Sequence, residues 1–211
     1  MRPLPLLLLI TAGGFLLRLG YTLFYPQPFF PDQSRFLGSI QLFSQSWQFP
    51  HGSMDMPLLI VFYGALSSLG LPEWGLRLLN ILASTATVYV AGLLARELAP
   101  DRKTGTKAMH TAALIAAVYP FFLFYAPLIM TEALFSLLLA TGMLFLLRQR
   151  LILSFLFFAL GNLTRPTLIY FLPVAAAYYI WLNRHQRPSR LLLRTGAAFA
   201  VFFLLMVPWV A

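Results

Sequence analysis

The feature that most constrains this chain is a series of long apolar runs that follow one another along nearly its whole length. A helix needs about 20 consecutive apolar residues to cross the hydrocarbon core of a bilayer. Of the 211 residues, 60% are hydrophobic and 10% are charged, whereas soluble domains carry about 25% charged residues. The sequence therefore predicts an all-α polytopic membrane protein, and it excludes a soluble globular domain and a disordered chain.

Seven of the runs are candidates for transmembrane helices. A further apolar run, Met56–Leu69, has only 14 residues and ends at a Gly-Leu-Pro turn. That length is more typical of a re-entrant or interfacial helix than of a span. The seven predicted spans are Leu4–Phe24, Trp74–Ala95, His110–Ile129, Thr131–Leu147, Leu151–Leu163, Leu168–Leu182 and Leu191–Ala211.

The basic residues predict how these spans are oriented, because Lys and Arg concentrate in cytoplasmic loops. If Met56–Leu69 does not span, eleven of the 15 basic residues fall on one face. They are Arg2, Arg96, Arg102, Lys103, Lys107, Arg148, Arg150, Arg184, Arg187, Arg190 and Arg194. This places the N-terminus inside, the C-terminus outside and a long outer loop over residues 26–73. The net charge of +9 is then an orientation signal, and it gives no reason to expect nucleic acid as a partner.

The predicted outer side holds the four other basic residues, together with four of the six acids. Arginine on this side opposes the usual charge bias, so each one needs a partner or a function. A planar guanidinium suits the phosphate of a lipid. The candidate phosphate-binding residues are therefore Arg165, Arg77, Arg35 and the more deeply placed Arg18, and the outer acids are Asp32, Asp55, Glu73 and Glu132.

Asp32 and Glu132 are the candidate catalytic carboxylates. Asp32 opens a stretch whose apolar residues recur with helical spacing as far as Trp47, which predicts an amphipathic helix in the outer interface. Asp32 is either the N-cap of that helix, a general base, or both. Glu132 follows Thr131 at the start of a span, where a threonine cap and the helix dipole already favour it.

Two further residues flank the short apolar run and are weaker candidates. Asp55 and His51 are either acceptor-binding residues or ordinary loop residues. The chain has no cysteine and three scattered histidines, so it shows no spacing typical of a metal site.

Taken in order, these segments resemble the GT-C superfamily of polytopic glycosyltransferases, which includes the protein O-mannosyltransferases and the aminoarabinose transferase of lipid A. The resemblance runs over nearly the whole chain. The motifs that carry it are Pro31-Asp32-Gln33, Met56-Pro57-Leu58-Leu59, the Gly75–Asn80 stretch, Thr131-Glu132, Leu163-Thr164-Arg165-Pro166 and Val207-Pro208-Trp209.

The resemblance implies transfer of a sugar from a polyprenyl-phosphate-linked donor to an acceptor on the extracytoplasmic face, with inversion at the sugar carbon. Asp32 would deprotonate the acceptor, and Arg165, with Arg77 or Arg35, would neutralise the departing phosphate. The family often has a second acid where this chain has Gln33. A divalent metal is therefore possible but not favoured.

Family members usually continue into further spans and an outer domain. We therefore expect residues 1–211 to form a single transmembrane domain without that C-terminal region, as a truncation, a minimal enzyme or a subunit with a partner. The expected location is a prokaryotic plasma (inner) membrane. The acceptor can be a glycan, a lipid or a protein.

Two other functions remain open. One is a non-catalytic membrane subunit or scaffold that binds a lipid carrier. The other is a transporter, which is less favoured because the charges gather at one face and not at the middle of the membrane.

Overall fold

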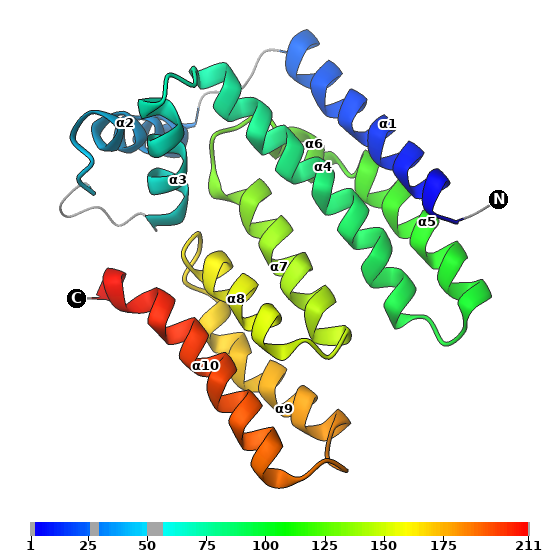
Figure 1. The fold of residues 1–211 in the computed structure, drawn as a ribbon. Coiled ribbons are helices and arrows are strands. Elements are labelled where there is room, and N and C mark those ends of the chain that lie inside the picture. The colour runs from blue at the N-terminus through cyan, green and yellow to red at the C-terminus, as the bar shows by residue number, and fades with distance from the viewer. Residues whose placement is uncertain (1–2, 26–29, 50–56, 211) are drawn as a thin grey trace.

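The computed structural model describes residues 3–25, 30–49 and 57–210, and within these ranges it contains helices and no strands (Figure 1). The prediction of an all-α protein is confirmed. The elements are α1 (Pro3–Phe24), α2 (Pro31–Ser46), α3 (Pro57–Ser68), α4 (Glu73–Leu98), α5 (Arg102–Val118), α6 (Pro120–Tyr125), α7 (Thr131–Leu147), α8 (Leu151–Asn162), the 3₁₀ turn η1 (Leu168–Phe171), α9 (Leu172–Leu182) and α10 (Pro188–Val210).

The helices form two groups that α7 joins. In one group α1, α4 and α5 lie side by side, and in the other α8 packs against α10 and α9 (Figure 1). Helix α7 contacts α4 on one side and α8 on the other. The pair α2 and α3 lies near the start of α4. We call this end of the bundle, where α4 and α7 begin and α8 ends, the α2/α3 end.

Three helices are long and apolar enough to cross a membrane: α1 over Leu4–Phe24, α4, and α10 over Pro188–Trp209. Large leucines on α1 and α10, among them Leu9, Leu16, Leu193 and Leu204, are exposed. Such an apolar surface suits contact with lipid and not with water. The apolar helices α3, α7, α8 and α9 are shorter, so the count of seven spans stays a prediction.

The predicted span His110–Ile129 is wrong in its limits. Helix α5 begins eight residues earlier, at Arg102, because the Asp101 carboxylate accepts hydrogen bonds from the N–H groups of Lys103 and Thr104, both at 2.9 Å. Hydrogen bonds from Thr104 and from the Lys103 N–H hold the pKa of Asp101 below its usual value. The helix ends at Val118, since a residue before proline avoids the helical conformation and Pro120 starts α6.

Several other limits agree with the sequence. Helix α7 begins and ends at the predicted residues, and α8 is one residue shorter than predicted. The short apolar run forms α3, with only 12 residues. Its placement as a re-entrant helix stays a prediction.

The predicted amphipathic helix forms as α2, which buries Phe36, Ile40 and Phe43. This face lies on α3, and the approach is closest at Gly64. A Cβ atom at Gly64 would lie 2.6 Å from Cδ1 of Phe43, so the contact requires glycine. The same apolar cluster includes Leu128 and Met130, just before α7. Helix α2 is therefore attached to the segment that begins α7.

Candidate functional site

The turn after α8 holds Arg165 in place. The Gly161 carbonyl accepts hydrogen bonds from the N–H groups of Thr164 and Arg165, both at 3.0 Å, and from the Thr164 hydroxyl at 2.6 Å. The Leu58 N–H, in the first turn of α3, donates to the Leu163 carbonyl at 3.0 Å. The residue before a proline avoids the helical conformation, so Pro166 ends any continuation of α8. The turn therefore ties α8 to α3.

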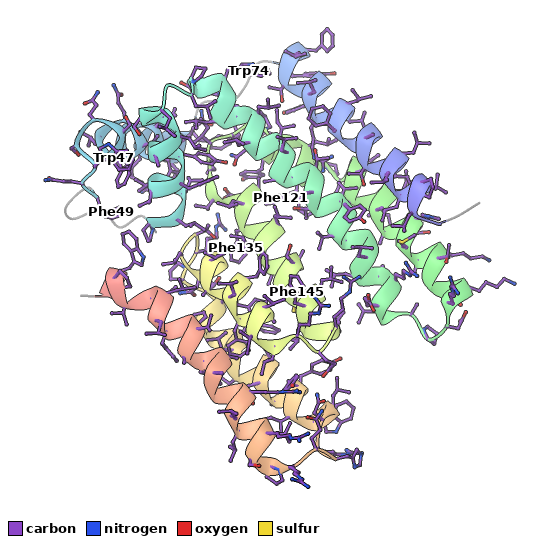
Figure 2. All side chains as sticks on the ribbon, viewed as in Figure 1. Trp47, Phe49, Trp74, Phe121, Phe135 and Phe145 are labelled. Atoms are coloured by element: carbon purple, nitrogen blue, oxygen red, sulfur yellow. The ribbon has the colours of Figure 1, made fainter. Side chains whose placement is uncertain are left out.

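The Arg165 guanidinium reaches the first two residues of α7. Its Nε donates to the Thr131 hydroxyl at 2.9 Å, and its Nη2 forms an ion pair with Oε1 of Glu132. Its Cζ lies 5.9 Å from the ring centroid of Phe135, which Figure 2 shows on α7 beside the loop after α8. Nη1 has no hydrogen bond to any residue that the structure describes, and 44% of the side chain is exposed. One edge of the guanidinium is therefore open to an anion.

Glu132 is the buried partner, with 10% of its side chain exposed. Its Oε2 has no hydrogen bond within the described residues. The side chain lines a narrow pocket with Ser84, Phe122 and Tyr125. The predicted threonine cap is wrong, because α7 has Met130 at its N-cap and the Thr131 hydroxyl accepts from Arg165. Thr131 was not a predicted site residue.

Arg77 is hydrogen-bonded to the segment that leads into α7. Its Nη1 donates to the Pro127 carbonyl at 3.0 Å, while Nε and Nη2 donate to Oε1 of Glu73 at 3.0 and 2.6 Å. Each of its three nitrogens therefore donates one hydrogen bond inside the protein. Arg77 reaches the same loop as the Arg165–Glu132 pair, but only 18% of its side chain is exposed.

A buried polar pair that the sequence analysis did not predict fixes the next residue of that loop. The Asn80 amide donates to the Leu128 carbonyl, and the Tyr63 hydroxyl donates to Oδ1 of Asn80. The signal that was available is a lone asparagine in a span, since a polar group in an apolar environment needs a partner.

Asp32 lies in the first turn of α2 and is exposed. It is the second residue of α2, whose N-cap is Phe30, so its prediction as the N-cap is wrong. Its carboxylate is 60% exposed and lies 3.5 Å from Nη2 of Arg35. No hydrogen bond or ion pair joins Asp32 to Glu132 or Arg165 in the described part of the chain.

Aromatic contacts nevertheless keep Asp32 at the α2/α3 end. The ring of Phe30 meets that of Phe124 edge to face, with centroids 5.8 Å apart. Figure 2 shows Phe49 next to the C-terminal end of α10, where its ring lies 5.7 Å from that of Trp209. The residues on both sides of α2 therefore rest on the bundle, Phe30 on α6 and Phe49 on α10.

Arg18 is fully buried and lies apart from these residues. Its Nε donates to Ser84 at 2.8 Å, and its two terminal nitrogens donate to the carbonyls of Gly14, Ala116 and Ala117 at 2.9 to 3.1 Å. Arg18 therefore joins α1 to α4 and caps the C-terminal end of α5, where cations are favoured. Through Ser84 it contacts the wall of the Glu132 pocket.

Asp55 and His51 lie outside the described residues. Within the described ranges, no group of three or more His, Asp or Glu side chains could hold a metal ion together.

Comparison with known proteins identifies the family. The model of the family described as dolichyl-phosphate-mannose-protein mannosyltransferase matches residues 55–211, which is more than half of the chain. The chain belongs to this family. It is a family of GT-C glycosyltransferases, so the resemblance predicted from the sequence is confirmed. The matched range includes Arg77, Glu132 and Arg165, and it begins after Asp32. No curated protein and no solved structure matches the chain.

Proposed function

We propose that this membrane protein transfers a sugar from a polyprenyl-phosphate-linked donor to an acceptor hydroxyl on the extracytoplasmic face, with inversion at the sugar carbon. The observation that carries the proposal is the geometry of Arg165. Two of its nitrogens are held by Thr131 and Glu132, and the third is open at the start of α7. A preoriented cation at a helix N-terminus is suited to a phosphate.

In this proposal Arg165 binds the phosphate of the donor. The bond between the sugar carbon and the phosphate oxygen breaks, and its electron pair stays on the phosphate, which leaves with one more negative charge. Arg165 stabilises that added charge through Nη1. Glu132 orients the guanidinium from its buried side, so we assign it a positioning role in place of the catalytic role predicted from the sequence.

Asp32 is the proposed general base. Its carboxylate takes the proton of the acceptor hydroxyl, and the acceptor oxygen attacks the sugar carbon on the face opposite the phosphate. Asp32 must leave Arg35 to do so. The cost is small, because the pair is exposed and such pairs contribute about 0–1 kcal/mol. Arg35 remains a candidate for contact with the donor phosphate.

The proposal also includes the position of the donor lipid, the membrane and the acceptor. The polyprenyl chain lies along the apolar helices, and residues 26–73 form the outer loop of a single transmembrane domain in a prokaryotic plasma membrane. The acceptor is a glycan, a lipid or a protein.

One observation favours a second candidate function. The family match begins at residue 55, so Asp32 lies outside it. A chain that keeps the phosphate-binding arginine but lacks a working base would be a carrier-binding subunit that acts with a partner.

Donor turnover by the purified chain separates the enzyme from the carrier-binding subunit. The chain is reconstituted in liposomes with dolichyl-phosphate mannose, carrying radiolabelled mannose, and an extract of membranes that lack the chain supplies acceptors. An enzyme incorporates label, and Arg165→Gln loses that incorporation, whereas Arg187→Gln, an exposed arginine before α10, keeps it. Binding of the donor without incorporation, restored by a co-purified protein, contradicts the enzyme and supports the subunit.

A further inference from the structure

A second polar site lies at the opposite end of the bundle. An open pocket of about 380 Å³ is lined by Tyr179 of α9, Arg194 of α10 and residues 149–153, which lead from the end of α7 into the first turn of α8. Helix α8 has 12 residues, so its two ends are about 18 Å apart at ~1.5 Å per residue. The pocket is therefore distinct from the Arg165 site, which follows the other end of α8.

Two arginines converge on this pocket without a counter-charge, Arg150 from the turn before α8 and Arg194 from α10. No carboxylate is among its lining residues. The Arg150 side chain has no hydrogen bond or ion pair to any described residue, although Arg148, two positions earlier, is paired with Glu97 at 2.8 Å. Nη1 of Arg194 donates to the Tyr179 hydroxyl at 3.2 Å, and its other nitrogens have no described partner. The positive-inside rule explains the presence of these arginines but not their convergence.

Tyr179 forms the buried base of the pocket. Its side chain is 1% exposed, and its hydroxyl accepts from Arg194. The hydroxyl hydrogen has no acceptor within the described ranges, so it remains available to an anionic oxygen. The turn beside it is fixed, because Gln149 adopts a left-handed conformation (φ 60°) and its side chain accepts a hydrogen bond from Asn183 at 2.6 Å.

The backbone at the start of α8 adds further donors. Arg150 is the N-cap and its side chain makes no capping hydrogen bond. The first N–H groups of a helix have no partner inside the helix, and here the residues that carry them, Leu151, Ile152 and Leu153, line the pocket. Two guanidinium groups, a buried hydroxyl and a helix N-terminus therefore surround one open volume.

We propose that this pocket binds the phosphate of an anionic membrane lipid. Guanidinium groups and helix N-termini are both suited to phosphate oxygens. The exposed apolar side chain of Ile152 lines the pocket, which favours a lipid over a free phosphate. Basic pockets between transmembrane helices bind anionic headgroups in this way. The site does not depend on the proposed function of Arg165.

Native mass spectrometry of the purified chain tests the proposal. The chain is presented with equal amounts of phosphatidylglycerol and phosphatidylcholine, with and without inorganic phosphate at the same concentration as the lipid. The test variant is Arg150→Gln/Arg194→Gln. The control is Lys103→Gln/Lys107→Gln, two exposed lysines of α5 that remove the same charge. Tyr179→Phe keeps the packing and removes only the hydroxyl, and thermal melts confirm that each variant is folded.

We expect the wild-type chain to retain phosphatidylglycerol preferentially and inorganic phosphate not to displace it. The double arginine variant should lose about thirtyfold in affinity, since each of the two basic residues near an anionic lipid contributes on the order of 1 kcal/mol. Tyr179→Phe should lose less, and the lysine control should match wild type. Equal affinity in the arginine and lysine variants would overturn the site. Displacement by inorganic phosphate would overturn the lipid as its ligand.

Discussion

Arg165 in the turn after α8 and Glu132 in the first turn of α7 form an ion pair that is buried on the side of the glutamate and open on the side of the arginine. The glutamate and Thr131 together fix two of the three guanidinium nitrogens. The pair therefore presents one cationic edge in a fixed orientation at the start of α7. This arrangement is what the proposed chemistry requires of a phosphate-binding residue.

Replacing Arg165 should separate the contribution of its charge from that of its planar hydrogen-bonding geometry. Arg165→Gln should lower kcat by about 10²–10³, the usual cost of removing one donor that stabilises charge in the transition state. Arg165→Lys keeps the charge but cannot hold Thr131, Glu132 and a phosphate at once, so it should restore only part of the rate. Sugar transfer and thermal melts are measured on both variants. Full activity in Arg165→Lys would show that the fixed hydrogen-bonding geometry of the guanidinium is not needed.

Glu132→Gln tests whether the glutamate positions Arg165. The amide oxygen can still accept from Arg165, so the variant should fold and should keep part of the activity. Because Arg165 would be held less firmly, the KM for the donor should rise more than kcat falls. A complete loss of kcat at unchanged KM would instead make Glu132 a catalytic residue.

Arg18 should matter for folding and not for the donor. Arg18→Met leaves the carbonyls of Ala116 and Ala117 without their donor in a buried place, and each unsatisfied buried group costs about 1–3 kcal/mol. We expect a clearly lower melting temperature with the donor KM unchanged. A raised KM in a chain of unchanged stability would return Arg18 to the phosphate site.

Two glycines of the α2–α3 pair offer a matched comparison. Gly64→Ala places a Cβ 2.6 Å from the Phe43 ring, and overpacking of this kind costs about 1–3 kcal/mol. It should shift α2, and with it Asp32, so activity should fall together with stability. Gly38→Ala meets nothing within 4 Å and should be neutral or stabilising. The same melting temperature in both variants would show that α2 does not depend on this contact.

Local signals predicted much of the fold. Apolar length and the flanking arginines located α7 and α8, and the short apolar run located α3. The error at His110–Ile129 came from weighing hydropathy above the capping signal of Asp101 and the break at Pro120, both of which are readable in the sequence. Proline is favoured at the first helical position. Pro31 therefore already indicated that Asp32 lies inside α2.

The candidate site was predictable as a set of residues but not as pairs. The Glu73–Arg77 pair is four residues apart on one helix and could be expected from that spacing. The Arg165–Glu132 pair is separated by 33 positions, and the contacts of Arg18 by as many as 99. Nothing local in the sequence indicates that Arg18 is fully enclosed by the protein and that Arg165 keeps an exposed edge. That distinction depends on how α4, α7 and α8 pack together.

The most direct test of the account is sugar transfer by Asp32→Asn. Asp101→Asn is the matched control, because it makes the same change in an exposed aspartate at the other end of the bundle and asparagine still caps a helix. Both variants are reconstituted in liposomes, and donor binding and sugar incorporation are measured on each. We expect Asp32→Asn to bind the donor as wild type does and to incorporate no sugar, while Asp101→Asn does both. Normal incorporation by Asp32→Asn would contradict it.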